Sequence, residues 1–424
     1  MRGPVVALLT LAAMAFGVAC REKKPPPVES GAKDVSAPEP SAPPTASASS
    51  APDAAVPRDA SIGDAHVTAS PTLGDAGPSA CKLIYGPQEQ PFRGTAFLAA
   101  SGNRLEVVAN DSGRTRGFGV PVPPTLAPVA PTRVLSFEPM SYPPCEPAGR
   151  FVYCPGRGGA IRRIDGMRER EVGKGRPATR IAAAPIGGDG HSVVAYLAER
   201  STTEGTMLQA FVILDEGEPV RLSDDGSGAT QLALVPAGDK VVALYLDART
   251  AMTPMHAREL TLGKDGKIEL GNDAVLTVGG PAERGVTLAS GRLRGATFAL
   301  VPMPQDVSSF GMTTLLVPSP PKDDVPVKVS AYANGLDPAP LAATRSETLD
   351  RMYVARVVPE SSERDAPRAL ELGHLVADGS FTSHGLVARG ARITDVAIAV
   401  DAAKAVWILY GDAAHTWLTR FACP

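Results

Sequence analysis

Five cysteines carry the most definite chemistry in this chain, and they stand at positions 20, 81, 145, 154 and 423. A cysteine sulfur can ligate zinc, pair in a disulfide or be modified covalently. No two of these cysteines have the Cys-x-x-Cys spacing typical of zinc sites. We therefore predict no metal and no cofactor, and we expect disulfides if the chain is exported to an oxidising compartment.

The first nineteen residues have the layout of an export signal. Met1 and Arg2 precede an uncharged, apolar stretch over residues 3–19, which is too short to cross a bilayer comfortably. No second long apolar run follows it, so the mature chain is predicted to have no transmembrane helix. The disulfide chemistry is thus placed outside the cytoplasm.

The signal ends Phe16-Gly17-Val18-Ala19-Cys20, and in this motif the chain resembles the bacterial lipoproteins. The resemblance implies cleavage after Ala19 and acylation of Cys20, which would attach the protein to a membrane. By the same resemblance, Arg21 in place of an aspartate implies an outer-membrane lipoprotein of the bacterial cell envelope. An ordinary periplasmic or secreted protein is the alternative, because Gly17-x-Ala19 also fits the general signal peptidase.

The parity of the cysteines favours lipidation. If Cys20 is acylated, four cysteines remain, which is the even number that two disulfides need. If Cys20 is not acylated, one thiol is left over.

Residues 21–80 are predicted to be a disordered linker. They contain 11 Pro, 13 Ala and 9 Ser, and no Phe, Trp, Tyr, Met or Cys. Such a segment cannot bury enough apolar surface to offset its chain entropy. We expect a tether between Cys20 and a folded body over residues 81–424.

The composition of the whole chain excludes two classes of protein. Lys and Arg number 42 against 45 Asp and Glu, so the basic footprint that nucleic acid binding requires is missing. The 42 Gly and 41 Pro favour turns and short strands over a helical bundle.

The body repeats one pattern, a short apolar run, a tight turn and a stronger apolar run. The centres of the stronger runs are 43 to 56 residues apart, and they fall at Phe97, Val152, Ala195, Ala243, Ala299, Ala355 and Trp407. Two units contain the phrases Asp265-Gly266 and Asp378-Gly379, which predict hairpins with type I′ turns. Units of four antiparallel strands at this period predict an all-β fold, a β-propeller of about seven blades, with six or eight as alternatives.

Two phrases before strong strands, Gly188-Asp189-Gly190 and Gly238-Asp239-Lys240, are similar to the repeats of the periplasmic TolB-like propellers. The resemblance covers a few residues in each unit and implies the fold alone, without any functional residue. A pair of β-sandwich domains is the competing fold, but it would not repeat this pattern.

A propeller must close its ring, and the last unit shows only three strands. Residues 81–86 could supply the fourth by running antiparallel to residues 416–423, which brings Cys81 next to Cys423. We predict that disulfide, and a local one between Cys145 and Cys154. In the competing assignment residues 82–86 are the innermost strand of the first blade, far from Cys423.

The titratable residues form no recognisable catalytic motif. We interpret the histidines as solvated or structural residues scattered along the chain, at His66, His191, His256, His374, His384 and His415. The acidic pairs Asp224-Asp225 and Asp323-Asp324 lack the pattern of a calcium loop and are interpreted as turns.

A run of basic residues in the second unit is the one charge cluster above background. It is predicted on exposed outer strands and comprises Arg157, Arg162, Arg163, Arg168, Arg170, Lys174, Arg176 and Arg180. As a binding site it would hold an anionic envelope polymer or a partner protein through the forked donors of arginine. The alternative is a solvated edge strand that resists aggregation through its charge.

Without a catalytic motif, we expect a lipid-anchored, non-catalytic binding or scaffold module of the bacterial envelope. The alternative is an exported propeller enzyme, of the lactonase or dehydrogenase kind. Such an enzyme needs acidic, His or Asn side chains that converge on one end of the central channel.

Overall fold

The structure is a computed structural model in which the chain divides into two units, Met1–His66 and Val67–Pro424. It describes residues 81–423 apart from residues 91, 93–95, 102–103, 112–113, 122–130, 135–144, 166–167, 178, 189, 203–204, 225–227, 248–253, 278–287, 305–309, 324–326, 332–340, 345–350, 360–366, 390–392 and 412–413. The predictions for Cys20, for the linker over residues 21–80 and for His66 lie outside the described residues.

The described strands of the second unit fall into seven antiparallel sheets, each with at least four strands. The first three sheets contain β2(Ala96–Ser101), β3(Arg104–Asp111), β4(Arg114–Pro121) and β5(Pro131–Val134); β6(Glu146–Ala148), β7(Phe151–Pro155), β8(Ala160–Asp165) and β9(Arg168–Lys174), with the short 3-10 helix η1(Arg157–Gly159); and β10(Ala182–Ile186), β11(His191–Thr202), β12(Gly205–Leu214) and β13(Val220–Arg221).

The other four sheets continue in chain order. They contain β14(Ala229–Ala237), β15(Lys240–Asp247), β16(Pro254–Leu262), β17(Ile268–Leu270) and β18(Ala274–Thr277); β19(Ala289–Leu293), β20(Ala296–Pro304), β21(Phe310–Val317) and β22(Val327–Ala331); β23(Leu341–Ala343), β24(Met352–Pro359), β25(Arg368–Leu375) and β26(Phe381–Ala388); and β27(Asp395–Val400), β28(Val406–Gly411), β29(Thr416–Ala422) and β1(Lys82–Glu89).

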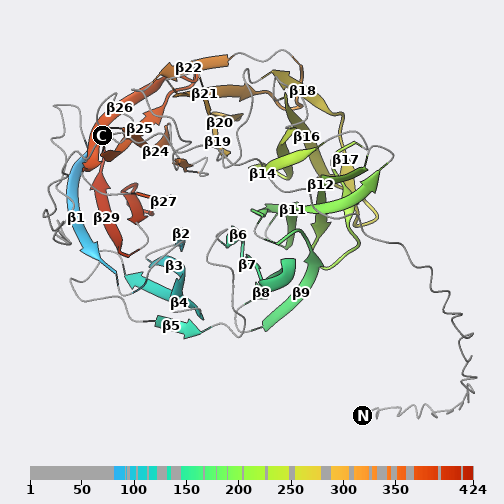
Figure 1. Cartoon of the computed structure of the whole chain (residues 1–424), viewed down its shortest axis with the longest axis horizontal. Helices are drawn as coiled ribbons and strands as arrows, with labels where there is room; N and C mark the ends of the chain where they lie inside the picture. Colours follow the sequence, from blue (N-terminus) through green and yellow to red (C-terminus); the bar gives the residue numbers. More distant parts are fainter. Residues whose placement is uncertain are drawn as a thin grey trace, which may run out of the picture. The chain divides into compact units, whose positions relative to one another are not determined.

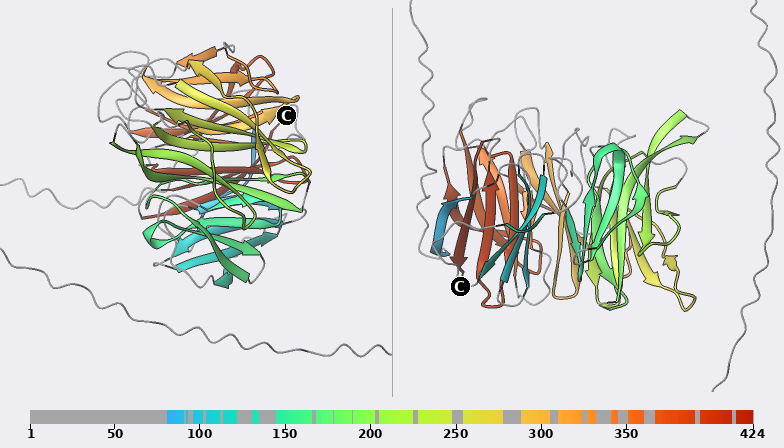
Figure 2. Two further views of the ribbon diagram at one scale, coloured as in Figure 1. Left: turned by 90° about the vertical axis from the view of Figure 1, so that its right-hand side faces the viewer. Right: turned by 90° about the horizontal axis from the view of Figure 1, so that it is seen from below.

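The sheets follow one another around a central axis, with the first strand of each toward the axis (Figure 1). Neighbouring first strands contact each other from β6 through β10, β14, β19, β23 and β27 to β2. Seen from the side, the strands run between the two faces of this arrangement (Figure 2). The fold is therefore all-β and β-propeller-like.

The apolar core lies between adjacent sheets. Among the described residues it forms six clusters, and each joins the facing sides of two neighbouring sheets. Val193 and Ala195 of β11, for example, pack with Ala243 and Tyr245 of β15. A sheet buried on both sides has near-continuous apolar strands, which explains the strong runs in the sequence.

The strand that begins the folded part completes the seventh sheet. β1 pairs antiparallel with β29 from Lys82↔Ala422 to Glu89↔Trp417. The Cα atoms of Cys81 and Cys423 lie 4.1 Å apart and their sulfurs are bonded, and Cys145 is bonded to Cys154. Both predicted disulfides are confirmed, and the competing place for residues 82–86 is wrong.

Two details of the repeat differ from the prediction. Phe97 lies in β2, the first strand of its sheet, whereas the other six centres lie in second strands. The second strand here, β3, carries Arg104, Glu106 and Asp111 among its apolar residues, so its apolar run is weaker than that of β2.

The hairpins at Asp265-Gly266 and Asp378-Gly379 are confirmed, but their turns are not type I′. Only the glycines have positive φ, at 74° and 83°. In the second hairpin, Gly379 N donates to Val376 O and Val376 N to Ser380 O, which frames a three-residue loop with glycine in the left-handed region. The aspartate accepts from Ser380 N, so its side chain stabilises the turn with negative φ at Asp378.

Candidate functional site

Exposed and buried polar side chains meet where the second sheet packs against the third. We call this group the junction cluster, and it comprises Tyr153, Arg163, Arg170, His191, Ser192, Asp215 and Glu216. Its members come from β7, β8, β9, the start of β11 and the turn after β12. Sheet packing therefore brings together residues up to 63 positions apart in the sequence.

A histidine and an aspartate form the chemical centre of the junction cluster. His191 Nδ1 lies 2.7 Å from Asp215 Oδ2. A carboxylate can only accept, so Nδ1 is the donor in this contact, and in the Nδ1–H tautomer Nε2 is an acceptor. The His191 side chain is 45% exposed, which gives solvent or a substrate access to the ring. This is the arrangement of a general base oriented by a carboxylate.

The position of Asp215 is fixed by its backbone and by Ser192. Asp215 follows β12 with a φ of 49°, in the left-handed region that non-glycine residues rarely adopt. Its Oδ1 accepts from Ser192 N at 3.0 Å, and its own N–H donates to Ser192 O at 2.8 Å. Since such backbone strain persists only where the surroundings enforce it, Asp215 is held rigidly beside His191.

Behind the dyad the junction cluster is buried. Ser192 Oγ lies 2.6 Å from the hydroxyl of Tyr153, and both residues are inaccessible to solvent. Burial raises the pKa of Tyr153, although the hydrogen bond to Ser192 opposes that shift. The neutral phenol thus serves as a fixed support for Ser192 and, through it, for Asp215.

Two arginines of the predicted basic patch complete the junction cluster. Arg163 of β8 and Arg170 of β9 lie opposite each other, and both bind Glu216. Arg163 Nη1 is also 3.8 Å from Asp215 Oδ1, and its guanidinium lies over the ring of Phe151. The arginines are therefore tied to the same turn that carries the dyad.

The remaining members of the patch do not gather with these two. Arg162 projects to the other side of the sheet and pairs with Glu171, and Arg176 pairs with Glu199. Arg168 and Lys174 lie on the edge strand β9, Arg157 lies in η1, and Arg180 precedes β10. Five members lie on the outer strands β8 and β9, whereas Arg157, Arg176 and Arg180 lie outside them, and alternation along β8 divides Arg162 from Arg163.

Two other histidines, in the sixth sheet, form a buried pair. His374 of β25 and His384 of β26 stack with ring centroids 4.8 Å apart, and His374 Nδ1 lies 2.9 Å from His384 Nε2. Burial, together with the nearby His384 and Arg351, lowers the pKa of His374 from 6.5 to about 4. The histidines are thus not scattered, because antiparallel pairing brings these two together.

The buried His374 predicts that the folded protein becomes less stable in acid. Between the pKa of an unfolded histidine, 6.5, and the folded value of about 4, the unfolded chain binds a proton that His374 does not. The stability contributed by neutral His374 is therefore complete above pH 6.5 and is lost as the pH falls toward 4. We expect the melting temperature to fall less between pH 7 and pH 4.5 in H374Q than in the unchanged protein.

A matched control is H415Q, since His415 lies directly before β29, away from the sixth sheet, and is more exposed. This variant should keep the full acid dependence. An equal acid dependence in H374Q and the unchanged protein would contradict the assignment.

A third polar group lies between the third and fourth sheets and is enclosed. His256 Nδ1 is 2.7 Å from Asp273 Oδ2, the ring stacks on Tyr245 at 4.6 Å, and Arg258 pairs with Asp273 and Asp224. The His256 side chain is only 10% exposed. The ring of His256 is therefore almost closed off from solvent by its partners.

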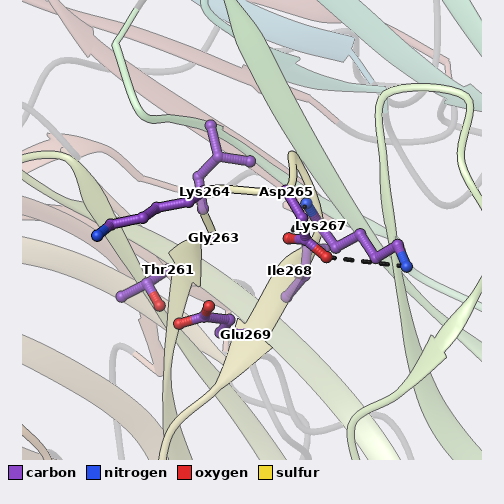
Figure 3. A pocket seen from close by; sticks show the side chains of 8 residues that line it. Thr261, Gly263, Lys264, Asp265, Lys267, Ile268 and Glu269 are labelled. Atoms are coloured by element: carbon purple, nitrogen blue, oxygen red, sulfur yellow. Dashed lines mark hydrogen bonds and ion pairs between the residues drawn. The ribbon is translucent and has the colours of Figure 1, made fainter.

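The hollow drawn in Figure 3 belongs to one exposed hairpin. Its lining runs from Thr261 to Glu269 along β16, the turn and β17. Lys267 and Asp265 interact across the turn, and no histidine contributes to the lining. Its charged residues, Lys264, Asp265, Lys267 and Glu269, all belong to this one hairpin.

The first strands, which lie toward the axis, carry few titratable groups in the described part of the chain. The seven first strands contain three charged residues there, Glu146, Arg292 and Asp395, and no histidine. Among the described residues, no group of three or more His, Cys, Asp or Glu is placed to hold a metal ion. No helix within the described ranges is long and apolar enough to span a membrane.

Fold and site together define a β-propeller-like protein with an exposed His-Asp dyad beside two arginines. No family model matches the sequence, and no curated protein does. Among solved structures, the chain is similar to a Trypanosoma rangeli sialidase (10% identity, TM-score 0.41, 81% of this chain and 57% of that one). It is also similar to a phage phi92 endosialidase (9%, 0.45, 83% and 69%) and to a subtype N11 neuraminidase-like protein from A/flat-faced bat/Peru (12%, 0.39, 75% and 97%).

These neighbours correct one prediction. A non-catalytic binding or scaffold module was expected, whereas the similar solved structures include sialidases, an endosialidase and a neuraminidase-like protein. These names are of enzymes or enzyme-like proteins, which was the alternative prediction. The likeness concerns the fold alone, the chain spans less than two thirds of the length of the sialidases it matches, and no residue role is taken from them.

Proposed function

We propose that this chain is an exported hydrolase of esters, lactones included, built as a closed seven-bladed β-propeller and anchored to the bacterial envelope through Cys20. The dyad of His191 and Asp215 carries this proposal, because it joins a half-exposed imidazole to a rigid carboxylate at 2.7 Å. The site lies at the junction of the second and third sheets, in place of the central channel. The seven sheets with contacting first strands support the blade number.

In this reaction His191 Nε2 accepts the proton of a water molecule while the water oxygen attacks the ester carbonyl carbon. The other ring proton stays on Nδ1, and Asp215 accepts its hydrogen bond and stabilises the imidazolium that forms. When the C–O bond breaks, Nε2 returns the proton to the departing alkoxide. Ser192 takes no part as a nucleophile, because its hydroxyl is buried against Tyr153.

Removal of the base should abolish most of the activity. In H191Q we expect kcat for a p-nitrophenyl ester or for a lactone to fall by about 100-fold or more, with KM little changed. D215N should act in the same direction, because an amide in place of the carboxylate no longer selects the Nδ1 tautomer. Initial rates, with circular dichroism as the check of folding, measure both effects.

H415Q is the matched control, since it removes a histidine of similar type that lies outside the junction cluster. It should leave kcat unchanged. Full ester hydrolysis by folded H191Q would reject the proposal, as would the absence of ester and lactone hydrolysis in the unchanged protein.

A further inference from the structure

A glutamate of the junction cluster is bound in the way a ligand would be. Arg163 Nη2 lies 2.5 Å from Glu216 Oε1, and Arg170 Nη1 lies 2.8 Å from Glu216 Oε2. Each carboxylate oxygen thus pairs with its own guanidinium, so two arginines hold one carboxylate between them by charge-assisted hydrogen bonds.

Strand pairing places the two cations opposite each other, and their proximity favours an anion between them. Arg163 and Arg170 are directly opposite on neighbouring strands, where like charges repel each other. Arg163 is only 14% exposed and lies over the ring of Phe151, with its charge centre 4.6 Å from the ring centroid. An uncompensated cation at this partly buried place is costly, so the position between the arginines favours a negative group.

The anion that fills this position belongs to a surface turn. Glu216 lies in the turn between β12 and β13, where residues 216–219 are exposed. Its side chain is 38% exposed and could leave the arginines without disturbing a packed core. Glu216 is thus a movable partner of Arg163, the least exposed member of the three.

We propose that Glu216 occupies the position of a substrate carboxylate, so that Arg163 and Arg170 form a binding site for esters or lactones that carry a carboxylate group. Such a ligand would displace Glu216 and bind both guanidinium groups. Arg163 also lies 3.8 Å from Asp215 Oδ1, so the bound carboxylate would be held beside the dyad. As a statement about substrate class, this inference rests on the proposed ester hydrolysis.

Displacement of Glu216 makes a quantitative prediction. A carboxylate on a short turn competes at an effective concentration in about the millimolar range. Its removal in E216Q should strengthen the binding of a free carboxylate by about tenfold. Within that variant, R170Q should weaken binding by about tenfold, since one of the two guanidinium groups is lost.

The probe is glutarate, which carries the carboxylate of a glutamate side chain, and its neutral counterpart is glutaramide. Binding is measured by isothermal titration calorimetry at low ionic strength. We expect glutarate to bind E216Q about tenfold more tightly than the unchanged protein, and glutaramide to bind neither. The matched control is E218Q, two residues further along the same exposed turn, which should behave as the unchanged protein.

Three results would overturn the inference. They are equal glutarate affinity in E216Q and the unchanged protein, full affinity in E216Q/R170Q, and binding of inorganic sulfate as tight as that of glutarate. The titration is repeated in H191Q, where binding should persist. Glutarate binding without any ester hydrolysis would reject the proposed function alone, whereas hydrolysis without the Glu216 effect would reject only this inference.

Discussion

Removal of the disulfide between Cys81 and Cys423 in the variant C81S/C423S is expected to lower the free energy of unfolding by about 6 kcal/mol. The bond links residues 342 positions apart, so it closes nearly the whole folded body into one loop. In the unfolded chain such a loop removes more conformational freedom than a short one does. Guanidinium unfolding followed by circular dichroism measures the loss.

The expected loss has a second, structural component. β1 is an outermost strand whose only strand partner among the described residues is β29, and Cys81 stands at the point where their pairing begins. Without the bond, β1 can separate from that end and expose the edge of β29. We therefore expect hydrogen exchange to accelerate in residues 82–89 before it does elsewhere.

The pair of Cys145 and Cys154 provides the comparison. This bond joins residues only nine positions apart and closes a short loop. The same entropy model therefore gives a loss of about 2.5 kcal/mol in the free energy of unfolding for C145S/C154S. A loss below about 1 kcal/mol in C81S/C423S, or a larger loss in the local pair, would contradict the argument.

Replacement of Asp401 by alanine is expected to lower the free energy of unfolding by about 3 to 5 kcal/mol. The Asp401 side chain is completely buried, and its Oδ2 lies 2.6 Å from Arg420 Nη2 and 2.9 Å from Trp407 Nε1. Its Oδ1 accepts from the backbone N–H groups of Ala403 and Ala405. The variant leaves a nearly buried guanidinium and three further donors without their acceptor, which explains the size of the loss.

Thermal and guanidinium unfolding of D401A would measure this effect, with the fluorescence of buried Trp407 as a local probe. D378A is the matched control, because Asp378 also caps a hairpin turn but does so at an exposed position. It should cost about 1 kcal/mol. Similar losses in D401A and D378A would show that the buried charge network contributes little.

Much of the fold could be predicted from short stretches of sequence. The strong runs around Ala195 and Ala243 are apolar throughout because β11 and β15 pack against neighbours on both sides. Turn glycines such as Gly266 and Gly379 mark hairpins because they adopt positive φ. The pairing of Cys81 with Cys423 followed from the strand that the last unit lacked, and the structure confirms it.

The turn type and one repeat centre were wrong for local reasons. The side chain of Asp378 accepts a hydrogen bond from Ser380 N and stabilises a turn in which Asp378 keeps a negative φ. Aspartate tolerates positive φ, but this turn does not require it there. Arg294-Gly295, which the pattern did not single out, has positive φ at both positions. Phe97 misplaced the first centre because β2 is more apolar than β3, which carries Arg104, Glu106 and Asp111.

The candidate site was only half visible in the sequence. The basic run identified Arg163 and Arg170, and His191 was noted as a single histidine. Asp215 and Glu216 were missed, although the phrase Asp215-Glu216-Gly217 after the apolar strand β12 marks a turn with two carboxylates. Nothing in the spacing shows which basic residues face that turn, and the prediction treated all of them alike.

The sequence by itself determined the elements of this protein, because strand alternation, apolar runs and turn residues act within a few neighbouring positions. The tertiary structure alone decided which side chains meet. Arg163 and Glu216 are 53 positions apart, and Tyr153 and Ser192 are 39 apart. These contacts depend on how one sheet packs against the next and on which side of each strand a residue lies, so a shift of one residue in register would separate them.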